Sequence, residues 1–367
     1  MPIKPKQKMP SRSRVKRYAL VLAAGQSKRF RSRLPKVLHP LCGKPLLLHI
    51  LDALGGLGLE KIFLVVGQGQ ESVQEASSGY PVQCVVQRKP LGTGDAVKAA
   101  APLLKGLEGS LLVLLGDTPL ITAGTLRRLF AAREKRGIDH LILTTHLDDP
   151  VGYGRVVRDP SGGVVRIVEE RDATAREKGI REINTGFHCF RIAPLLQGLD
   201  ELSPSNAAGE YYLTDLAGIL RAKGCAVEAL STAVREEVRG INNREELAAA
   251  ESEMRQAIRR TWLRKGVSMR DPSSVHIDAD VVLAPDTTLH PGVVIEGRSR
   301  IASGCTIGSF SHLRNAVLGR NVLVDHCSVV RDSRVGEGAR IGPFALVRGG
   351  EIGPRTRTGS FVEIKNV

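Results

Sequence analysis

The sequence of 367 residues has few cysteines, few aromatic residues and no long apolar segment. Its six cysteines are far apart and include no C-x-x-C pair, which excludes a zinc ribbon and a dense disulfide framework. We therefore expect reduced thiols and a cytoplasmic protein. The longest uninterrupted apolar runs, such as Leu111 to Leu115, are far shorter than the roughly 20 residues that cross a bilayer, so no membrane partner is expected.

The segment 1–17 lacks acidic side chains but contains seven lysines or arginines, nearly half of the formal net charge of +15. The apolar run that follows is short and leads into Gly25-Gln26-Ser27-Lys28-Arg29 rather than a cleavage site, which argues against a secretion signal. Binding to nucleic acid is an alternative, because clustered cations release counterions on phosphates. Since no aromatic residue interleaves the charges, we interpret residues 1–17 as a solvated, disordered arm without a nucleic-acid partner.

The overall composition is that of an ordinary soluble protein, with 42% apolar and 25% charged residues. At about 150 residues per domain, the length predicts two or three domains.

From Tyr18 to about Thr232, short apolar runs alternate with segments of helical periodicity. The strands expected are Tyr18 to Ala24, Ile62 to Gly67, Val82 to Gln87, Leu111 to Leu115 and Leu141 to Thr145. The helices expected are Pro45 to Leu57, Thr93 to Leu104 and Thr125 to Arg136. This alternation predicts an α/β domain with a largely parallel, Rossmann-like sheet covered by helices on both faces. Ligands of such sheets bind beyond the carboxyl ends of the strands.

The C-terminal part has a hexapeptide apolar repeat, which follows a linking helix that ends near Gly266. The repeated residues are Ile277, Leu283, Leu289, Ile295, Ile301 and Ile307, then, after a phase shift, Val317, Leu323, Val329, Val335, Ile341 and Val347, and finally Ile352 and Ile364. Such a period is typical of a parallel β-helix. The sequence thus predicts a basic tail at 1–17, an α/β domain at 18–243, a linker helix at 244–266 and a β-helix at 267–367.

The first predicted strand leads into Leu22-Ala23-Ala24-Gly25, with Arg29 and Lys36 following. Small residues let backbone N–H groups approach a phosphate closely, and the two cations supply charge for a polyphosphate. Neither the G-x-x-x-x-G-K-[ST] nor the G-x-G-x-x-G pattern is present, so this segment is neither a P-loop nor a dinucleotide fingerprint. Taken alone, such a segment is more often an ordinary loop than a site.

Polar residues also follow two other predicted strands. Gln87 can pair with a base edge, and Gly92 and Thr93 open a helix whose N-terminus favours an anion. Asp117 comes directly after an apolar strand, where a carboxylate suits Mg²⁺ held together with substrate phosphates. The alternative for Asp117 is a helix cap or a turn.

The order and spacing of these segments resemble the family of bifunctional N-acetylglucosamine-1-phosphate uridylyltransferases / glucosamine-1-phosphate acetyltransferases. The resemblance runs from about Tyr18 to the last residue. Its other motifs are Leu34-Pro-Lys36-Val-Leu-His39, Gly152-Tyr-Gly-Arg155, Ile167-Val-Glu169, Glu182-Ile-Asn-Thr-Gly186, Glu210-Tyr-Tyr-Leu-Thr-Asp215, Gly240-Ile-Asn242-Asn243-Arg244, Ile341-Gly-Pro-Phe344 and Phe361-Val-Glu-Ile-Lys365.

The resemblance implies a role for each matching residue. The uridine nucleotide would be held by Leu22, Ala23, Ala24, Gly25, Gln87, Gly92 and Thr93. Its phosphates would contact the catalytic cations Arg29 and Lys36. The amino-sugar phosphate would be bound by Gly154, Glu169 and Asn184, and Mg²⁺ by Asp117 and Asn242, with Asn243 as the alternative ligand.

The reaction implied is attack of a sugar-1-phosphate oxygen on the α-phosphorus of UTP, which forms UDP-N-acetylglucosamine and expels pyrophosphate. The attacking phosphate is already anionic, so no general base is needed, and positioning and charge neutralisation should dominate. The family also implies a left-handed β-helix and a homotrimer.

The sequence departs from the family at a few positions. Ser27, Lys28 and Leu115 replace residues usual in the family, so selectivity for the nucleotide or the sugar could differ. Arg348 and Lys365 match sugar-phosphate contacts of the acetyltransferase site, but family members continue beyond residue 367 with the catalytic histidine. We therefore expect no acetyltransferase activity from this chain. The alternatives are a related enzyme that uses another sugar-1-phosphate or dTTP, and a non-catalytic trimeric scaffold.

Overall fold

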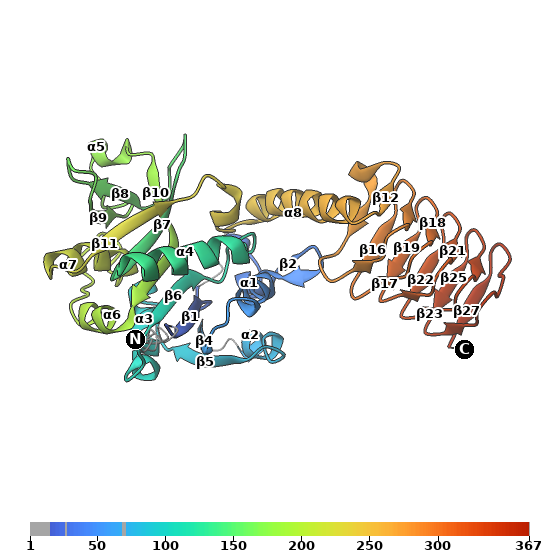
Figure 1. The fold of residues 1–367 in the computed structure, drawn as a ribbon, viewed down its shortest axis with the longest axis horizontal. Coiled ribbons are helices and arrows are strands. Elements are labelled where there is room, and N and C mark those ends of the chain that lie inside the picture. Colours follow the sequence, from blue (N-terminus) through green and yellow to red (C-terminus); the bar gives the residue numbers. More distant parts are fainter. Residues whose placement is uncertain (1–14, 26–27, 68–70, 367) are drawn as a thin grey trace, which may run out of the picture. The chain divides into compact units, whose positions relative to one another are not determined.

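The computed structural model describes residues 15–25, 28–67 and 71–366 (Figure 1). The chain forms two compact units. The first comprises Met1–Leu38 and Leu47–Gly240, and the second comprises His39–Leu46 and Ile241–Val367. Most of the predicted basic tail lies outside the described residues. Arg17, which the sequence assigns to that tail, is instead the first residue of a strand, where its guanidinium donates to Glu134 at 2.6 and 2.8 Å.

The first unit is built on a sheet with the strand order β11-β7-β10-β6-β1-β4-β5. Its strands are β1 (Arg17–Leu22), β4 (Lys61–Gly67), β5 (Val82–Gln87), β6 (Ser110–Leu115), β7 (His140–His146), β10 (Glu182–Arg191) and β11 (Val227–Ser231). All neighbouring pairs are parallel except those of β10, which runs antiparallel to β6 and β7. The short strands β8 (Arg155–Arg158) and β9 (Val164–Val168) extend from β10.

Helices cover both faces of this sheet. The helices are α1 (Leu46–Gly55), α2 (Glu71–Ala76), α3 (Thr93–Leu104), α4 (Ala123–Arg136), α5 (Ala175–Lys178), α6 (Ile192–Leu199) and α7 (Leu216–Ala222). Alternate residues of β1 pack on opposite sides, because side chains of a strand alternate between its faces. Ala19 and Val21 share a core with α1, α2 and α4, whereas Leu20 shares one with α3, α6 and α7.

The predicted α/β fold is confirmed, and the expected strands and helices form within a few residues of their predicted bounds. Strands β8 to β11 and helices α2, α5, α6 and α7 are not among the predicted elements, and β10 is the longest of them. Its segment carries polar residues and a register irregularity between Asn184 and His188, which interrupt the apolar pattern that identifies a strand.

The second unit contains the hairpin β2 (Pro40–Leu41) and β3 (Lys44–Pro45), helix α8 (Arg244–Arg264) and a left-handed parallel β-helix. The β-helix has three parallel sheets, in which each strand pairs with the third strand after it, except that β25 pairs with β27. The first sheet is β12 (Ser268–Met269), β15 (Thr288–Leu289), β18 (Thr306–Ile307), β21 (Leu323–Val324) and β24 (Arg340–Ile341). The second is β13 (His276–Ile277), β16 (Val294–Glu296), β19 (His312–Arg314), β22 (Val329–Arg331), β25 (Leu346–Arg348) and β27 (Glu363–Lys365). The third is β14 (Val282–Leu283), β17 (Arg300–Ile301), β20 (Val317–Leu318), β23 (Arg334–Val335) and β26 (Glu351–Ile352).

The phase of the repeat differs from the sequence-based prediction in the middle of the β-helix. The buried residues there are Leu318, Val324 and Val330, each one position after the Val317, Leu323 and Val329 expected. Val282 pairs with Arg300, and Arg300 pairs with Val317, so the second of these coils is shorter than the first by a single position. Such a shortening moves the next inward position, because successive residues of a strand face opposite sides.

Among the described helices, none is long and apolar enough to span a membrane. All six cysteines are free.

Candidate active site

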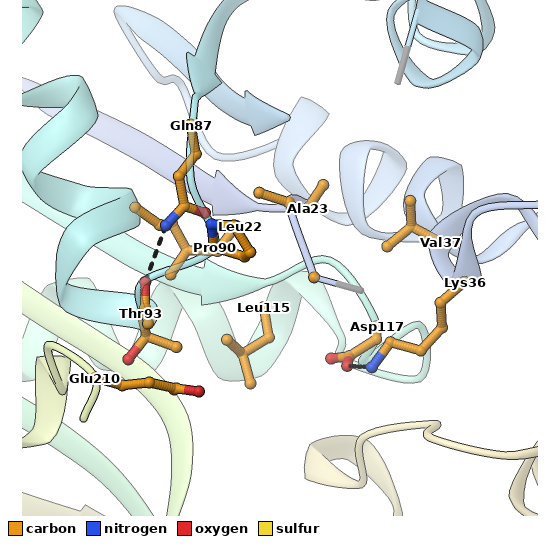
Figure 2. Close-up of a pocket in the computed structure, with 14 residues that line it drawn as sticks. Leu22, Ala23, Lys36, Val37, Gln87, Pro90, Thr93, Leu115, Asp117 and Glu210 are labelled. Carbon is orange, nitrogen blue, oxygen red and sulfur yellow. Dashed lines mark hydrogen bonds and ion pairs between the residues drawn. The ribbon is translucent and has the colours of Figure 1, made fainter. Parts of the chain in front are cut away.

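A cavity of about 650 Å³ lies at the carboxyl ends of β1, β5 and β6, where a parallel sheet places its ligands. Figure 2 shows side chains from these three strand ends facing it. Nine predicted site residues line it: Leu22, Ala23, Ala24, Gly25, Lys36, Gln87, Gly92, Thr93 and Asp117. The fold therefore brings the predicted nucleotide contacts to one place, together with the aspartate predicted to bind metal.

Lys36 and Asp117 form an ion pair beside this cavity, although they are 81 residues apart in the chain (Figure 2). The ammonium of Lys36 contacts Oδ2 of Asp117, and each side chain is about 15% exposed. The other carboxylate oxygen, Oδ1, is buried and has no hydrogen-bond partner among the described residues. This oxygen can accept a cation, so the site fits a divalent metal held on one carboxylate and on phosphate oxygens. The described residues contain no group of three or more His, Cys, Asp or Glu side chains that could hold a metal alone.

The loop that begins α3 is shaped by its close approach to residues 210–213. Gly92 has φ +109°, and a Cβ at this position would lie 2.5 Å from the carbonyl oxygen of Tyr211. Gly94 N–H donates to the same oxygen at 2.7 Å, and Leu213 N–H donates to Thr93 Oγ1 at 3.1 Å. Glycine is required at position 92 because a side chain would be both strained and blocked.

A second cavity of about 750 Å³ adjoins the first. It is lined by Arg29, Gly152, Glu169, Glu170, Arg171, Ala208, Glu210 and Tyr212. Glu210 lines both cavities, so the two are neighbours within the first unit. Of the two predicted catalytic cations, Lys36 lines the first cavity and Arg29 the second.

Of the predicted sugar-phosphate residues, Glu169 lines this second cavity, and Gly154 and Asn184 are linked to it through the contacts that follow. Asn184 N–H donates to the carbonyl oxygen of Gly154 at 2.8 Å. A Cβ on Gly154 would lie 3.3 Å from both carboxylate oxygens of Glu169, so a side chain at this position would crowd that carboxylate. Thr214 Oγ1 donates to Glu169 Oε1 at 2.8 Å.

Two titratable groups of the second cavity have raised pKa values. Burial raises the pKa of Glu169 above its usual value, and the nearby Asp215 adds to the shift. Burial, with the neighbouring Asp172 and Glu169, raises the pKa of Tyr212 to about 12. The Tyr212 hydroxyl is therefore neutral at physiological pH and can donate a hydrogen bond.

Three predicted site residues belong to the second unit. Asn242 N–H donates to Glu246 Oε2 at 2.6 Å, whereas both polar atoms of the neighbouring Asn243 side chain bond Glu246 and cap α8. Arg348 and Lys365 are register partners on β25 and β27, and both pair with Glu363, at 3.3 and 2.6 Å. Ser27 lies outside the described residues.

The segment 210–214 carries no predicted site residue, although it belongs to one of the family motifs. In the structure, Glu210 lines both cavities, the Tyr211 backbone holds the Gly92 loop, and Thr214 bonds Glu169. The polar residues that precede this segment carry no periodic signal, so only the motif match could have drawn attention to it.

Known proteins resemble this chain in both sequence and fold. Residues 19–183 match the model of the MobA-like NTP transferase domain family. The bifunctional protein GlmU of Geobacillus thermodenitrificans is 46% identical over 352 residues, which are 96% of this chain and 76% of that protein. GlmU of Heliobacterium modesticaldum is 43% identical over 95% of this chain and 76% of its own length. A crystal structure of UDP-glucose pyrophosphorylase with UDP-glucose shares the fold, with a TM-score of 0.54 and 17% identity over 66% of this chain and all of the other.

This architecture, with its two adjoining cavities, is that of a nucleotidyltransferase. More narrowly, the chain belongs to the bifunctional GlmU family, which confirms the resemblance seen in its sequence. It is an enzyme of the UDP-N-acetylglucosamine diphosphorylase type.

Proposed function

We propose that this protein transfers uridylyl from UTP to N-acetylglucosamine-1-phosphate in a Mg²⁺-dependent reaction, forming UDP-N-acetylglucosamine and pyrophosphate. The observation that carries the proposal is the pair of adjoining cavities that share Glu210. The first cavity is lined by the small residues at 22–25, the side-chain amide of Gln87 and the Lys36–Asp117 pair, as a nucleoside triphosphate requires. The other holds Arg29, Glu169 and Tyr212, as a phosphorylated sugar requires.

In this proposal the residues of the first cavity bind and orient the triphosphate. The backbone of Leu22 to Gly25 and of the Gly92 loop approaches the nucleotide, because these segments carry little side-chain bulk. Lys36 neutralises phosphate charge as the α-phosphorus is attacked. The protein's contribution is positioning and electrostatic stabilisation rather than covalent catalysis.

The second cavity would hold the attacking sugar-1-phosphate. Arg29, which the resemblance assigns to the phosphates of the nucleotide, lines this second cavity and would also contact the phosphate of the sugar. The carboxylate of Glu169 and the hydroxyl of Tyr212 suit sugar hydroxyl and amide groups. Gly154 and Asn184 would fix the position of that carboxylate and of the adjacent backbone. Because the attacking phosphate is ionised at neutral pH, no side chain needs to remove its proton.

Mg²⁺ would be held by Asp117, whose Oδ1 has no partner among the described residues, together with Asn242 and phosphate oxygens. When bound, the metal would supply charge neutralisation at the triphosphate.

The test is pyrophosphate release from UTP and N-acetylglucosamine-1-phosphate, with and without Mg²⁺, against a panel of other sugar-1-phosphates and dTTP. We expect the fastest release with the named pair and none after EDTA treatment. Faster release with another sugar phosphate, or with dTTP, would favour a related pyrophosphorylase. The absence of release with every pair would favour a non-catalytic scaffold.

We further propose a cytoplasmic homotrimer. Three phenylalanines with positive φ repeat along one corner of the β-helix and are exposed to 47–78%, namely Phe310, Phe344 and Phe361. An exposed apolar row of this kind favours contact with another subunit. Sedimentation analysis tests the trimer, and a monomer at micromolar concentration would contradict it. The expected lack of acetyl transfer by residues 1–367 stays a prediction, which thiol release from acetyl-CoA and glucosamine-1-phosphate would contradict.

A further inference from the structure

The side-chain amide of Gln87 is held in one orientation by two acceptors. Its Nε2 donates to Asp95 Oδ2 at 2.7 Å and to the carbonyl oxygen of Gly92 at 3.2 Å. Figure 2 shows the bond to the Gly92 carbonyl at the edge of the first cavity. Gln87 is only 5% exposed, so its amide has little water with which to exchange these bonds.

The chemistry of the two partners dictates which end of the amide faces them. A carboxylate and a backbone carbonyl accept hydrogen bonds and cannot donate them, so both must face the NH₂ group. A flipped amide would place its oxygen against two other oxygens. The Gln87 oxygen Oε1 is therefore left for a ligand, and among the described residues it accepts no hydrogen bond. Gln87 therefore presents a hydrogen-bond acceptor, not a donor, to the cavity that it lines.

We propose that Asp95 is a positioning residue that selects the base of the nucleotide. By fixing the amide of Gln87, it presents an acceptor to the ring N–H of uracil and thymine. The corresponding ring nitrogen of cytosine is itself an acceptor and would face Oε1 without a proton between them. An unpaired buried polar contact is costly, so the site rejects cytidine nucleotides. The inference rests on the proposed function in taking the first cavity as the nucleotide site.

A purely structural role for Asp95 makes a different prediction. Asp95 lies in the first turn of α3, where a negative charge stabilises a helix through its dipole. That role would lower stability when the charge is lost, but it would weaken all nucleotides alike. The positioning role instead requires a group that only accepts hydrogen bonds. An asparagine at this place offers its own NH₂ and allows the Gln87 amide to flip.

The experiment compares Asp95→Asn with the wild type and with Asp95→Glu, which keeps an acceptor-only group. Glu71→Gln is the matched control, since Glu71 is an acidic residue in the first turn of α2 and away from the cavity lining. Equilibrium affinities for UTP and CTP are measured by calorimetry, and kcat/KM for both is measured with N-acetylglucosamine-1-phosphate. Circular dichroism melting curves monitor folding.

We expect the wild type and Glu71→Gln to favour UTP, and Asp95→Asn to lose about tenfold or more of that preference. Asp95→Glu should restore most of it. Equal losses for UTP and CTP in Asp95→Asn, or a wild type without preference, would overturn the proposal. A wild type that binds UTP in preference to CTP but turns over no sugar phosphate would instead overturn the proposed function, and the affinities would still decide the role of Asp95.

Discussion

The two units of the chain are built on contacts of different range. In the β-helix, each strand pairs with the strand one coil further along the chain, and each inward side chain repeats the environment of the one before it. In the α/β unit, the candidate site joins residues that are distant in sequence, such as Lys36 with Asp117 and Thr93 with Leu213, 120 residues apart. A repeat can be read locally, whereas a site of this kind exists only once the sheet has formed.

The two units also differ in what their buried residues do, since those of the β-helix provide stability and those of the α/β cavities provide chemical groups. The β-helix interior is apolar, with Ile295 and Leu313 fully buried, and its strength comes from packing. The cavities of the α/β unit contain a buried carboxylate oxygen without a described partner and a glutamate with a raised pKa, features that cost stability and are typical of functional sites. Substitutions in the two units should therefore have different consequences.

We expect the strongest loss of activity at Asp117. Asp117→Asn should lower kcat/KM for UDP-sugar formation by about 10³-fold or more, because the metal that neutralises the phosphates loses its anionic ligand. Pyrophosphate release measures the loss. Asp52→Asn is the control, since Asp52 accepts a hydrogen bond from Tyr80 on an exposed surface and should leave turnover unchanged. Near-normal turnover in Asp117→Asn would contradict the metal assignment.

The core of the β-helix should respond in stability rather than in activity. Ile295→Ala removes a fully buried side chain and should destabilise the β-helix by about 2–5 kcal/mol, as cavity-forming substitutions do. Chemical denaturation followed by circular dichroism measures this change. The neighbouring Val294 faces outward, so Val294→Ala should cost much less. If Ile295→Ala abolished nucleotide binding at a temperature where the protein stays folded, the two units would not be separable as argued.

The α/β unit should be sensitive to acid through a buried histidine pair. Burial lowers the pKa of His188 to about 3 and also lowers that of its neighbour His140, with the two ring nitrogens 3.0 Å apart. The unfolded chain takes up protons below about pH 6.5, but the folded pair does not. The stability of the fold is therefore full above that pH and lost progressively as the pH falls toward 3, by more than about 1 kcal/mol by pH 4.

Unfolding curves recorded from pH 7 to pH 4 test this dependence. His188→Gln should flatten the curve, because it removes a group that must stay neutral to remain buried. His146→Gln replaces an exposed histidine on the same sheet and should leave the pH dependence as it is. If the dependence of stability on pH were unchanged in His188→Gln, other groups would be the cause of the acid sensitivity.

A modest gain of stability is expected at Glu169. Since burial raises its pKa, the ionised form is disfavoured in the folded protein, and Glu169→Gln should stabilise the α/β unit at pH 7 by about 1 kcal/mol. The advantage should shrink as the pH falls through the raised pKa, where the wild-type carboxyl is already protonated. Melting temperatures at pH 7 and pH 4 show this, while affinity for N-acetylglucosamine-1-phosphate should decrease. A variant less stable than the wild type at pH 7 would contradict the assignment.

Much of the fold could be predicted from the sequence because its signals are local. Strand β5 (Val82–Gln87) and helix α3 (Thr93–Leu104) form over the predicted residues, since each has uninterrupted periodicity and clear ends. The phase of Leu318 could not be predicted, because Val317 and Leu318 are both apolar and only the length of the preceding turn decides which one faces inward. β10 could not be predicted because polar residues such as Glu182, Asn184 and His188 interrupt its apolar pattern, although Glu182 and His188 are buried.

The sequence could predict which residues form the site, but not which groups their side chains contact. Loops after apolar strands, small residues and isolated charges mark where chemistry can occur, and the motif spacing identified the family. That Asp117 pairs with Lys36 and keeps its other oxygen without a described partner depends on side chains that are 81 residues apart in the chain.

Patterns among neighbouring positions were enough to specify both architectures, because the helical, strand and hexapeptide periods are local properties of the chain. They could not specify which polar groups face each other, which of them are buried and how their pKa values shift. Those features emerge only on folding, since hydrogen bonding and desolvation act through space at a few ångströms, a distance that separation along the chain does not define.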